Sequence, residues 1–412
     1  MDLHPICAFF LQAPPTNLTA SHDAFTLFRQ RFAFIVNGVF TCILAFLGCL
    51  LNVICILIFV KPLKRHRSPL IYYYLISLEF WDTFLLINAF LMYALPTVYY
   101  GRLVATGPYV TVYPYVYGFS NVSLIGTVWV VMTLTIDRYI ALVRPLDHRV
   151  LRRGQRIKRL LLLVSVSALF YGIPRFFELR VVHCPKPDQN DTLPLIIQGS
   201  LATNRVYMVI YRIIGGLLFY SVGPFVLLLL LTLRISVEIT KASRRRSSMC
   251  RGTTHRYGQA TERSSQLMLL AVVIKFLCAH CMPTGLDLAE HVIGSAEFRN
   301  DSTASLLVDI SNLLVVLNSS TNFLTYFACG QSFRVGCKSL LQKRKLRSRS
   351  TMEARSHYEL SRTEETRGVR KRGATHGAAE FELKEKRKEL RKVRTDTYLS
   401  VSDQMTVLER LV

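Results

Sequence analysis

The chain has 412 residues, of which 51% are hydrophobic, and a mean hydropathy of +0.29. These values are too high for soluble domains and indicate a membrane protein. The net charge of +24 would by itself also fit a nucleic-acid-binding protein. However, the Lys and Arg residues gather in clusters between and after long apolar runs, as cytoplasmic loops do. We therefore expect a membrane protein without a nucleic-acid partner.

Seven apolar runs along the chain are long enough to cross a membrane. A helix needs about 20 mostly apolar residues to span about 30 Å of hydrocarbon at about 1.5 Å per residue. The runs cover residues 33–60, 70–93, 110–142, 157–177, 207–237, 266–293 and 305–329. The sequence predicts an all-α bundle of seven transmembrane helices. We divide it into an N-terminal segment 1–32, a membrane domain 33–335 and a polar, disordered tail 336–412.

The basic clusters also predict the orientation of the chain in a multi-pass plasma-membrane protein. They follow spans one, three and five, so these loops are cytoplasmic, the N-terminus is extracellular and the C-terminus is cytoplasmic. Asn17, Asn190 and Asn300 start N-x-S/T sequons on the outer side and are predicted glycosylation sites. The N-terminus has no basic flank and only a short apolar run, so we expect no cleaved leader.

Polar side chains inside the spans must find partners or a water-filled cavity. Asp82 lies midway along span two, and Asn318, Ser319 and Asn322 form a polar cluster in span seven. Hydrogen bonding between helices would explain a lone Asn or Ser. An acid at midspan facing such a cluster favours a functional role. Lys275, on the inner half of span six, is expected to snorkel to the interface or to pair with a neighbour.

Prolines interrupt spans five and six. Pro224 and Pro283 remove helical hydrogen bonds, and the carbonyls they free must be satisfied by neighbouring helices. The prolines predict kinks in both spans. Whether the kinks act as hinges or only set the packing of the helices stays open at this point.

The order of motifs along these spans resembles that of the rhodopsin-like (class A) G-protein-coupled receptors. Asp137-Arg138-Tyr139, at the inner end of span three, is similar to the family's cytoplasmic switch motif. "NFLTY", 322–326, resembles its Asn-Pro-x-x-Tyr motif, with phenylalanine in place of proline. "GQSFR", 330–334, resembles the start of its short amphipathic eighth helix, and Cys337 would then be a palmitoylation site.

Two longer stretches point to one branch of that family. "YGIPRFFEL", 171–179, and "LNSSTNFLTYFACGQSFR", 317–334, resemble the invertebrate FMRFamide-type neuropeptide receptors. The chain also departs from the family, because His280 and Cys281 stand where span six has its activation-linked aromatic residue. The usual partner of Cys184 at the start of span three is missing, so Cys184 is either free or paired with Cys7.

The resemblance implies a mechanism and its partners. Ligand binding shifts a two-state bundle, which opens a cleft for a heterotrimeric G protein; arrestin and membrane lipid are further partners. The implied activation switch comprises Asp137, Arg138, Tyr139, Asn322, Tyr326 and Pro283. The implied sodium pocket, the only cofactor site expected, comprises Asp82, Thr127, Asn318, Ser319 and Asn322.

A peptide is the ligand class that the resemblance favours. Ser120 stands where amine receptors have an aspartate, and span seven has no lysine for retinal. A peptide ending in Arg-Phe-amide would need a carboxylate for its guanidinium and aromatic rings for its phenylalanine. The candidate ligand residues are Asp287, Glu290, Asp309, Glu178, Tyr113, Tyr117 and Tyr211. The alternative is that these acids are rim charges paired with Arg175, Arg180 or Arg212.

Two other functions were weighed against a signalling receptor. A secondary transporter also carries buried acids and broken helices, but the seven spans show none of the internal repeats that such transporters have. A receptor-like protein with impaired coupling would fit the altered motif of span six. No metal-binding spacing, nucleophile motif or phosphate-binding loop occurs in the sequence, so we do not expect an enzyme.

Overall fold

The computed structural model describes residues 20–63, 70–100, 109–143, 154–185, 192–249, 256–294, 297–298 and 301–339. These residues belong to one compact unit that ends at Ser339, and Leu340–Val412 form a second unit outside the described residues. The predicted glycosylation sites Asn17, Asn190 and Asn300 also lie outside the described residues.

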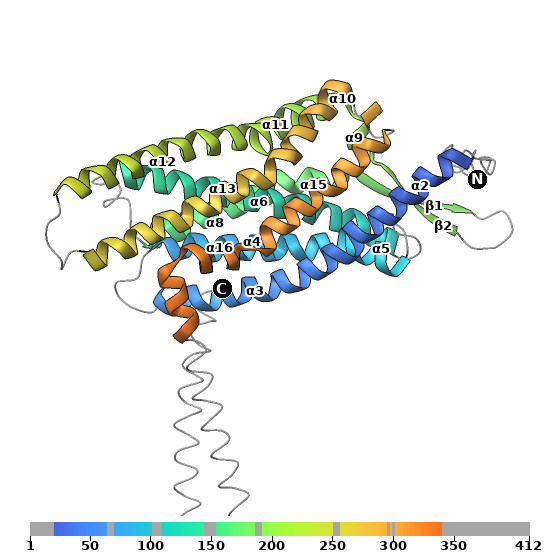
Figure 1. The fold of residues 1–412 in the computed structure, drawn as a ribbon. Coiled ribbons are helices and arrows are strands. Elements are labelled where there is room, and N and C mark those ends of the chain that lie inside the picture. The colour runs from blue at the N-terminus through green and yellow to red at the C-terminus, as the bar shows by residue number, and fades with distance from the viewer. Residues whose placement is uncertain are drawn as a thin grey trace, which may run out of the picture. The chain divides into compact units, whose positions relative to one another are not determined.

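Helices that run alongside one another make up almost all of this unit (Figure 1). The first two spans are α2 (Ala20–Ala33), η1 (Phe34–Phe40) and α3 (Thr41–Leu63), then α4 (Ile71–Ala89), η2 (Phe90–Ala94) and α5 (Leu95–Tyr100). The third and fourth are α6 (Tyr109–Val143), then α8 (Gly154–Gly172) and η3 (Ile173–Phe177). The fifth is α10 (Arg205–Tyr207), η4 (Met208–Gly215), α11 (Gly216–Phe219) and α12 (Val222–Met249). The last two are α13 (Arg256–Ile293), then α15 (Ser302–Ser320) and α16 (Asn322–Cys329), followed by helix 331–339.

The prediction of a seven-helix membrane bundle is confirmed. Among the described residues, seven helical stretches are long and apolar enough to cross a membrane: Leu27–Val60, Ile71–Tyr99, Tyr109–Val143, Gly154–Phe177, Arg205–Lys241, Gln266–Ile293 and Ser302–Ser320. The first begins before the predicted start at 33, because α2 already carries the chain into η1 and α3 as continuous helix. Helix 331–339 stands where the eighth helix was predicted.

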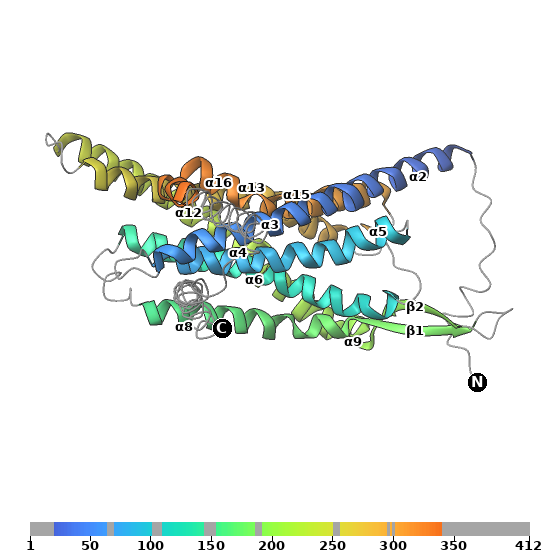
Figure 2. The ribbon, with the colours of Figure 1, turned by 90° about the horizontal axis from the view of Figure 1, so that it is seen from below.

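A β-hairpin connects spans four and five and was not predicted. Strand β1 (Leu179–Pro185) pairs antiparallel with β2 (Thr192–Gln198), with Leu179 opposite Gln198. The hairpin extends beyond the helix ends near the start of α6 (Figure 2); we call this end of the bundle the hairpin end. Cys184 of β1 is disulfide-bonded, so the alternative of a free thiol is wrong. Its partner lies outside the described residues, and pairing with Cys7 stays a prediction.

Helix α6 lies at the centre of the bundle, where it packs against α4, α8 and α12. Close approach to α4 depends on Gly126, because a Cβ atom at that position would overlap the indole ring of Trp81. The same ring reaches across to span four, where Trp81 Nε1 donates a hydrogen bond of 3.2 Å to Ser165 Oγ. Trp81 therefore joins three spans through the space that a glycine leaves.

Span five breaks just before its proline, as the sequence predicted. Helix α11 ends at Phe219 and α12 begins at Val222, two residues before Pro224. Gly223 is required here, because a Cβ atom would overlap the carbonyl of Leu218. At the break, Trp129 Nε1 of α6 donates a 2.8 Å hydrogen bond to the carbonyl oxygen of Phe219. A neighbouring helix thus satisfies a carbonyl at the break, as a membrane interior demands.

Span seven breaks without a proline. Helix α15 ends at Ser320 and α16 begins at Asn322, with Thr321 between them at φ −106° and ψ 11°. Phe323, which replaces the proline of the related motif, packs against Phe333 of helix 331–339. The break therefore has a physical cause other than proline, and this cause lies in the contacts of the polar core.

The packing of Trp81 against Gly126 can be tested by adding one methyl group. We expect Gly126→Ala to lower the stability of the purified protein by about 1–3 kcal/mol, the cost of overpacking a core. A thermal-unfolding assay measures the change. Gly285→Ala on α13 is the control, because nothing lies within 4 Å of the added Cβ. If the Gly126→Ala protein has the same melting temperature as the Gly285→Ala control, this result would contradict the packing of Trp81 against Gly126.

Candidate functional site

A cavity of about 230 Å³ lies between α4, η2, α6, α13 and α15 in the hairpin half of the bundle. Most of its lining residues are apolar or aromatic, and Tyr93, Tyr220 and Phe298 are among them. Asp287 and Glu290 of α13 supply two carboxylates, and no basic residue occurs among the described residues that line it. An apolar cavity with a few converging polar groups is the usual form of a ligand site.

Local helix geometry explains why these two acids share the cavity. They are three residues apart on α13, so their side chains lie on the same face of the helix about one turn apart. Pro283, one turn earlier on the same helix, also lines the cavity. This cavity therefore brings together two of the seven predicted ligand residues, Asp287 and Glu290.

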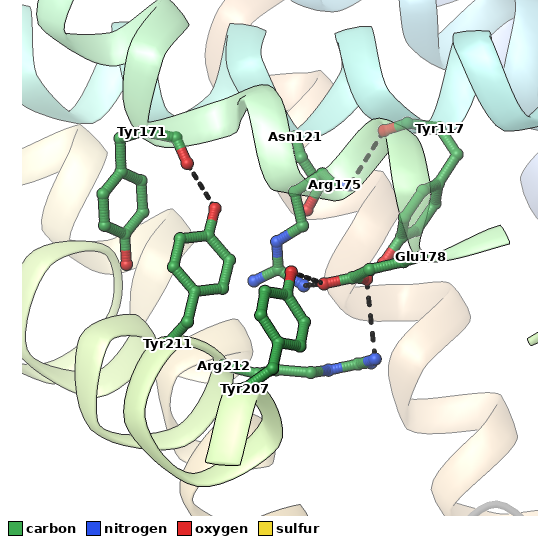
Figure 3. A network of polar contacts seen from close by, with 8 residues as sticks. All are labelled: Tyr117, Asn121, Tyr171, Arg175, Glu178, Tyr207, Tyr211 and Arg212. Atoms are coloured by element: carbon green, nitrogen blue, oxygen red, sulfur yellow. Dashed lines mark hydrogen bonds and ion pairs between the residues drawn. The ribbon is translucent and has the colours of Figure 1, made fainter. Parts of the chain in front are cut away.

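Glu178, a third predicted ligand residue, does not line this cavity and belongs to another network of polar contacts (Figure 3). Its side chain is only 1% exposed. The carboxylate accepts hydrogen bonds from Tyr117 Oη at 2.8 Å and Tyr207 Oη at 2.7 Å. Arg175 Nη1 lies 3.2 Å away and Arg212 Nη1 3.6 Å away. Glu178 thus matches the alternative in which the acid is paired with arginines, although here the pair is buried.

The aromatic rings around this network pack against one another. Tyr211 donates a hydrogen bond to the backbone carbonyl of Tyr171 and stacks on Tyr207 with ring centroids 5.0 Å apart. The guanidinium of Arg175 lies over the Tyr211 ring, 5.6 Å from its centroid. Together with Glu178, these contacts join the hairpin ends of spans three, four and five.

Two further predicted ligand residues also have partners within the protein. Asp309 of α15 is buried and accepts a 2.8 Å hydrogen bond from Asn37 Nδ2 of η1, which joins spans one and seven. Tyr113 packs edge-on against Tyr109 in the first turns of α6. A role in ligand binding for Glu178, Asp309 and the three tyrosines stays a prediction.

Deeper in the bundle, the side chains predicted for a sodium pocket form a polar core. Asp82 of α4 is 1% exposed. Its Oδ1 accepts hydrogen bonds from Ser319 Oγ at 2.9 Å and Thr127 Oγ1 at 3.3 Å. Its Oδ2 accepts one from Asn322 Nδ2 at 2.5 Å. Asn318 differs, because its buried Oδ1 has no hydrogen-bond partner among the described residues.

Two charged residues of this core were not recognised as site residues in the sequence. Glu79, one turn before Asp82 on α4, is fully buried and accepts a 2.6 Å hydrogen bond from Tyr326 Oη. Lys275 of α13 points into the core, where its Nζ lies 2.5 Å from Asn322 Oδ1. Glu79 was visible as a second acid in a span. The partner of Lys275 was not, because it lies on another helix 47 positions along the chain.

At the opposite end of the bundle, Arg138 forms an ion pair with its neighbour Asp137. Arg138 also lines a cavity of only about 40 Å³ with Thr135 of α6, Ile235 of α12 and Leu269 of α13. Tyr139, the third residue of the predicted switch motif, is partly buried. The three helices therefore converge on Arg138 and leave little space between them.

Comparisons with known proteins agree with these features. The sequence model of the family "7 transmembrane receptor (rhodopsin family)" matches residues 51–326, which include the polar core and Arg138. The chain belongs to this family. Its predicted resemblance to rhodopsin-like receptors is confirmed.

Two of its relatives belong, by their names, to the FMRFamide branch that the sequence predicted. The chain is 30% identical over 341 residues to the FMRFamide receptor of Drosophila melanogaster, a match covering 81% of this chain and 58% of the relative. It is 27% identical over 297 residues to the FMRFamide peptide receptor frpr-18 of Caenorhabditis elegans, covering 71% and 66%. The sex peptide receptor of Drosophila melanogaster is 23% identical over 234 residues, covering 52% and 51%. The matches thus span less than two thirds of the length of each of these three relatives.

The altered motif of span six forms an aromatic pair in this chain. His280 is buried and stacks on Phe276 with ring centroids 3.9 Å apart, whereas Cys281 is exposed on the surface of the helix. His280 Nε2 has no hydrogen-bond partner among the described residues. In this motif of span six, the ring of His280 is therefore buried in the bundle, whereas the thiol of Cys281 is not.

Phe333 packs helix 331–339 against the bundle. Phe333 is 3% exposed and packs against Phe59 of α3 and Tyr326 of α16. Cys337 lies on the same helix, and partial burial raises the pKa of its thiol. Palmitoylation of Cys337 stays a prediction.

The Glu178 network predicts a large effect on stability from the loss of one charge. Glu178→Gln leaves Arg175 buried without its carboxylate, so we expect the free energy of unfolding of the protein to fall by about 3 kcal/mol. Thermal unfolding of the purified protein measures the loss. Glu238→Gln on α12 is the matched control, because its ion pair with Lys241 is exposed and such pairs contribute about 1 kcal/mol or less. Equal stability of the two variants would contradict a structural role for Glu178.

Proposed function

We propose that the chain is a plasma-membrane receptor for a neuropeptide and signals through a heterotrimeric G protein. Its membership of the rhodopsin family supports this proposal, as do two relatives whose names include FMRFamide. The N-terminus and the hairpin would face the outside of the cell, in agreement with the basic loops at the other end. The family match leaves the transporter alternative without support.

The pair Asp287 and Glu290 is the observation that carries the choice of ligand. Two carboxylates in a cavity whose other lining residues are mostly apolar or aromatic suit a ligand that combines a cationic group with apolar or aromatic groups. A peptide that ends in Arg-Phe-amide has this combination. The cavity is smaller than those that usually enclose a whole ligand, so it would hold only the end of the peptide.

Helix α13 offers a physical connection from this cavity to the G-protein side. Asp287, Glu290 and Pro283 line the cavity, and Leu269 of the same helix lines the small space beside Arg138. A ligand that binds better when α13 is displaced would shift the bundle towards the displaced state. The space beside Arg138 would then widen enough for a partner to insert.

The proposal predicts which acids determine peptide potency. We expect Asp287→Ala and Glu290→Ala each to reduce the potency of FMRFamide at least about tenfold, the scale of a lost charged hydrogen bond. A calcium readout with a promiscuous G protein, at equal surface expression, measures potency. Glu297→Ala is the matched control, since this acid is exposed and is not among the residues that line the cavity.

The outcomes separate the proposal from its alternatives. Wild-type potency in both cavity variants would rule out this binding site. Binding of labelled FMRFamide without any calcium response would instead favour the receptor-like protein with impaired coupling. A response to other peptides but not to FMRFamide would support the proposed receptor function and show that its ligand is a different peptide.

A further inference from the structure

The polar core contains more buried charge than the predicted sodium pocket requires. Glu79 and Asp82, one turn apart on α4, are 0% and 1% exposed. Lys275 of α13 enters the same core from the other side. A buried carboxylate is costly unless a positive charge or hydrogen bonds compensate it. Glu79 and Asp82 must therefore be compensated by a positive charge or by hydrogen bonds within this core.

Lys275 uses all three of its N–H donors at the break in span seven. Its Nζ lies 2.7 Å from the carbonyl oxygen of Asn318, 2.5 Å from Asn322 Oδ1 and 3.5 Å from Thr321 Oγ1. Asn322 in turn donates through Nδ2 to Asp82 Oδ2 at 2.5 Å. The amide of Asn322 thus accepts from the ammonium on one side and donates to the carboxylate on the other.

This arrangement does not fit a sodium ion at Asp82. A small hard cation needs several oxygen ligands around it. Asn322 turns its N–H group towards Asp82, and its oxygen is already bonded to Lys275. Both carboxylate oxygens of Asp82 already accept hydrogen bonds. A sodium ion would therefore lack the Asn322 oxygen and would lie one amide away from a second positive charge.

We propose that Lys275 is the resident cation of this pocket and makes the receptor insensitive to sodium. Its ammonium supplies the positive charge near Asp82, and its helix α13 is thereby tied to the junction of α15 and α16. This device is independent of which ligand or G protein the receptor uses. In this chain, the ammonium group of Lys275 takes the place of the sodium ion that the family resemblance implies.

The test compares the thermal stability of the purified full-length receptor in sodium chloride and in N-methyl-D-glucamine chloride at equal ionic strength. We expect the melting temperature of the wild type to differ by less than about 1 °C. Lys275→Met should gain a sodium-dependent rise of about 2 °C or more, because Asp82 then has no cation and binds one from solution. The double variant Lys275→Met, Asp82→Asn should lose that rise again.

Lys241→Met is the matched control, since this lysine is exposed on α12 and pairs only with Glu238 among the described residues; it should behave as the wild type. A sodium-dependent rise in the wild type would overturn the proposal. So would a folded Lys275→Met protein without any sodium response. If Lys275→Met does not fold, the wild type and Asp82→Asn provide the test. The proposal requires that sodium leave the melting temperature of both proteins unchanged. No peptide or G protein is needed, so this result is independent of the proposed function.

Discussion

The hydrogen-bonded chain from Lys275 through Asn322 to Asp82 is the constraint on which the rest of the membrane core depends. It joins α13 to the junction of α15 and α16 and then to α4. A helix that breaks inside a membrane must have its freed polar groups satisfied by neighbours. Lys275 does this by donating hydrogen bonds to the carbonyl oxygen of Asn318 and to Oδ1 of Asn322. The contact explains how span seven can break at Thr321 although phenylalanine stands in place of proline.

Different contacts join the helices in the two halves of the bundle. At the hairpin end, Glu178 and its arginine and tyrosine partners connect spans three, four and five. Helix α13 takes part in the cavity at that end and in the small space beside Arg138 at the other. Between these two places, its charged contact with the core is through Lys275. A movement of α13 that links ligand binding to coupling would therefore have to stretch or break the Lys275 contacts.

Much of the fold could be predicted from the sequence, because each span is a long apolar run with its own length constraint. Asp287 and Glu290 could also be placed, since their spacing beyond Pro283 puts them on one face of a known helix. Arg175 and Arg212 could be named as alternative partners of Glu178, but its burial and its contacts with Tyr117 and Tyr207 could not be predicted, because they depend on the packing of three separate segments. The β1–β2 hairpin was missed for a similar reason: its two short strands lie in a loop whose pairing leaves no periodic signal. Lys275 was noticed as unusual, but only the fold shows which helix it meets.

A double-mutant cycle on Lys275 and Asp82 tests the central claim most directly. Lys275→Met, Asp82→Asn and the double variant would be compared with the wild type by the free energy of thermal unfolding. If the two side chains act as one charged unit through Asn322, their coupling energy should be at least about 1 kcal/mol. The double variant should then be more stable than the sum of the single losses predicts. Simple additivity of the two single losses would show that the ammonium and the carboxylate act independently, and would contradict the account.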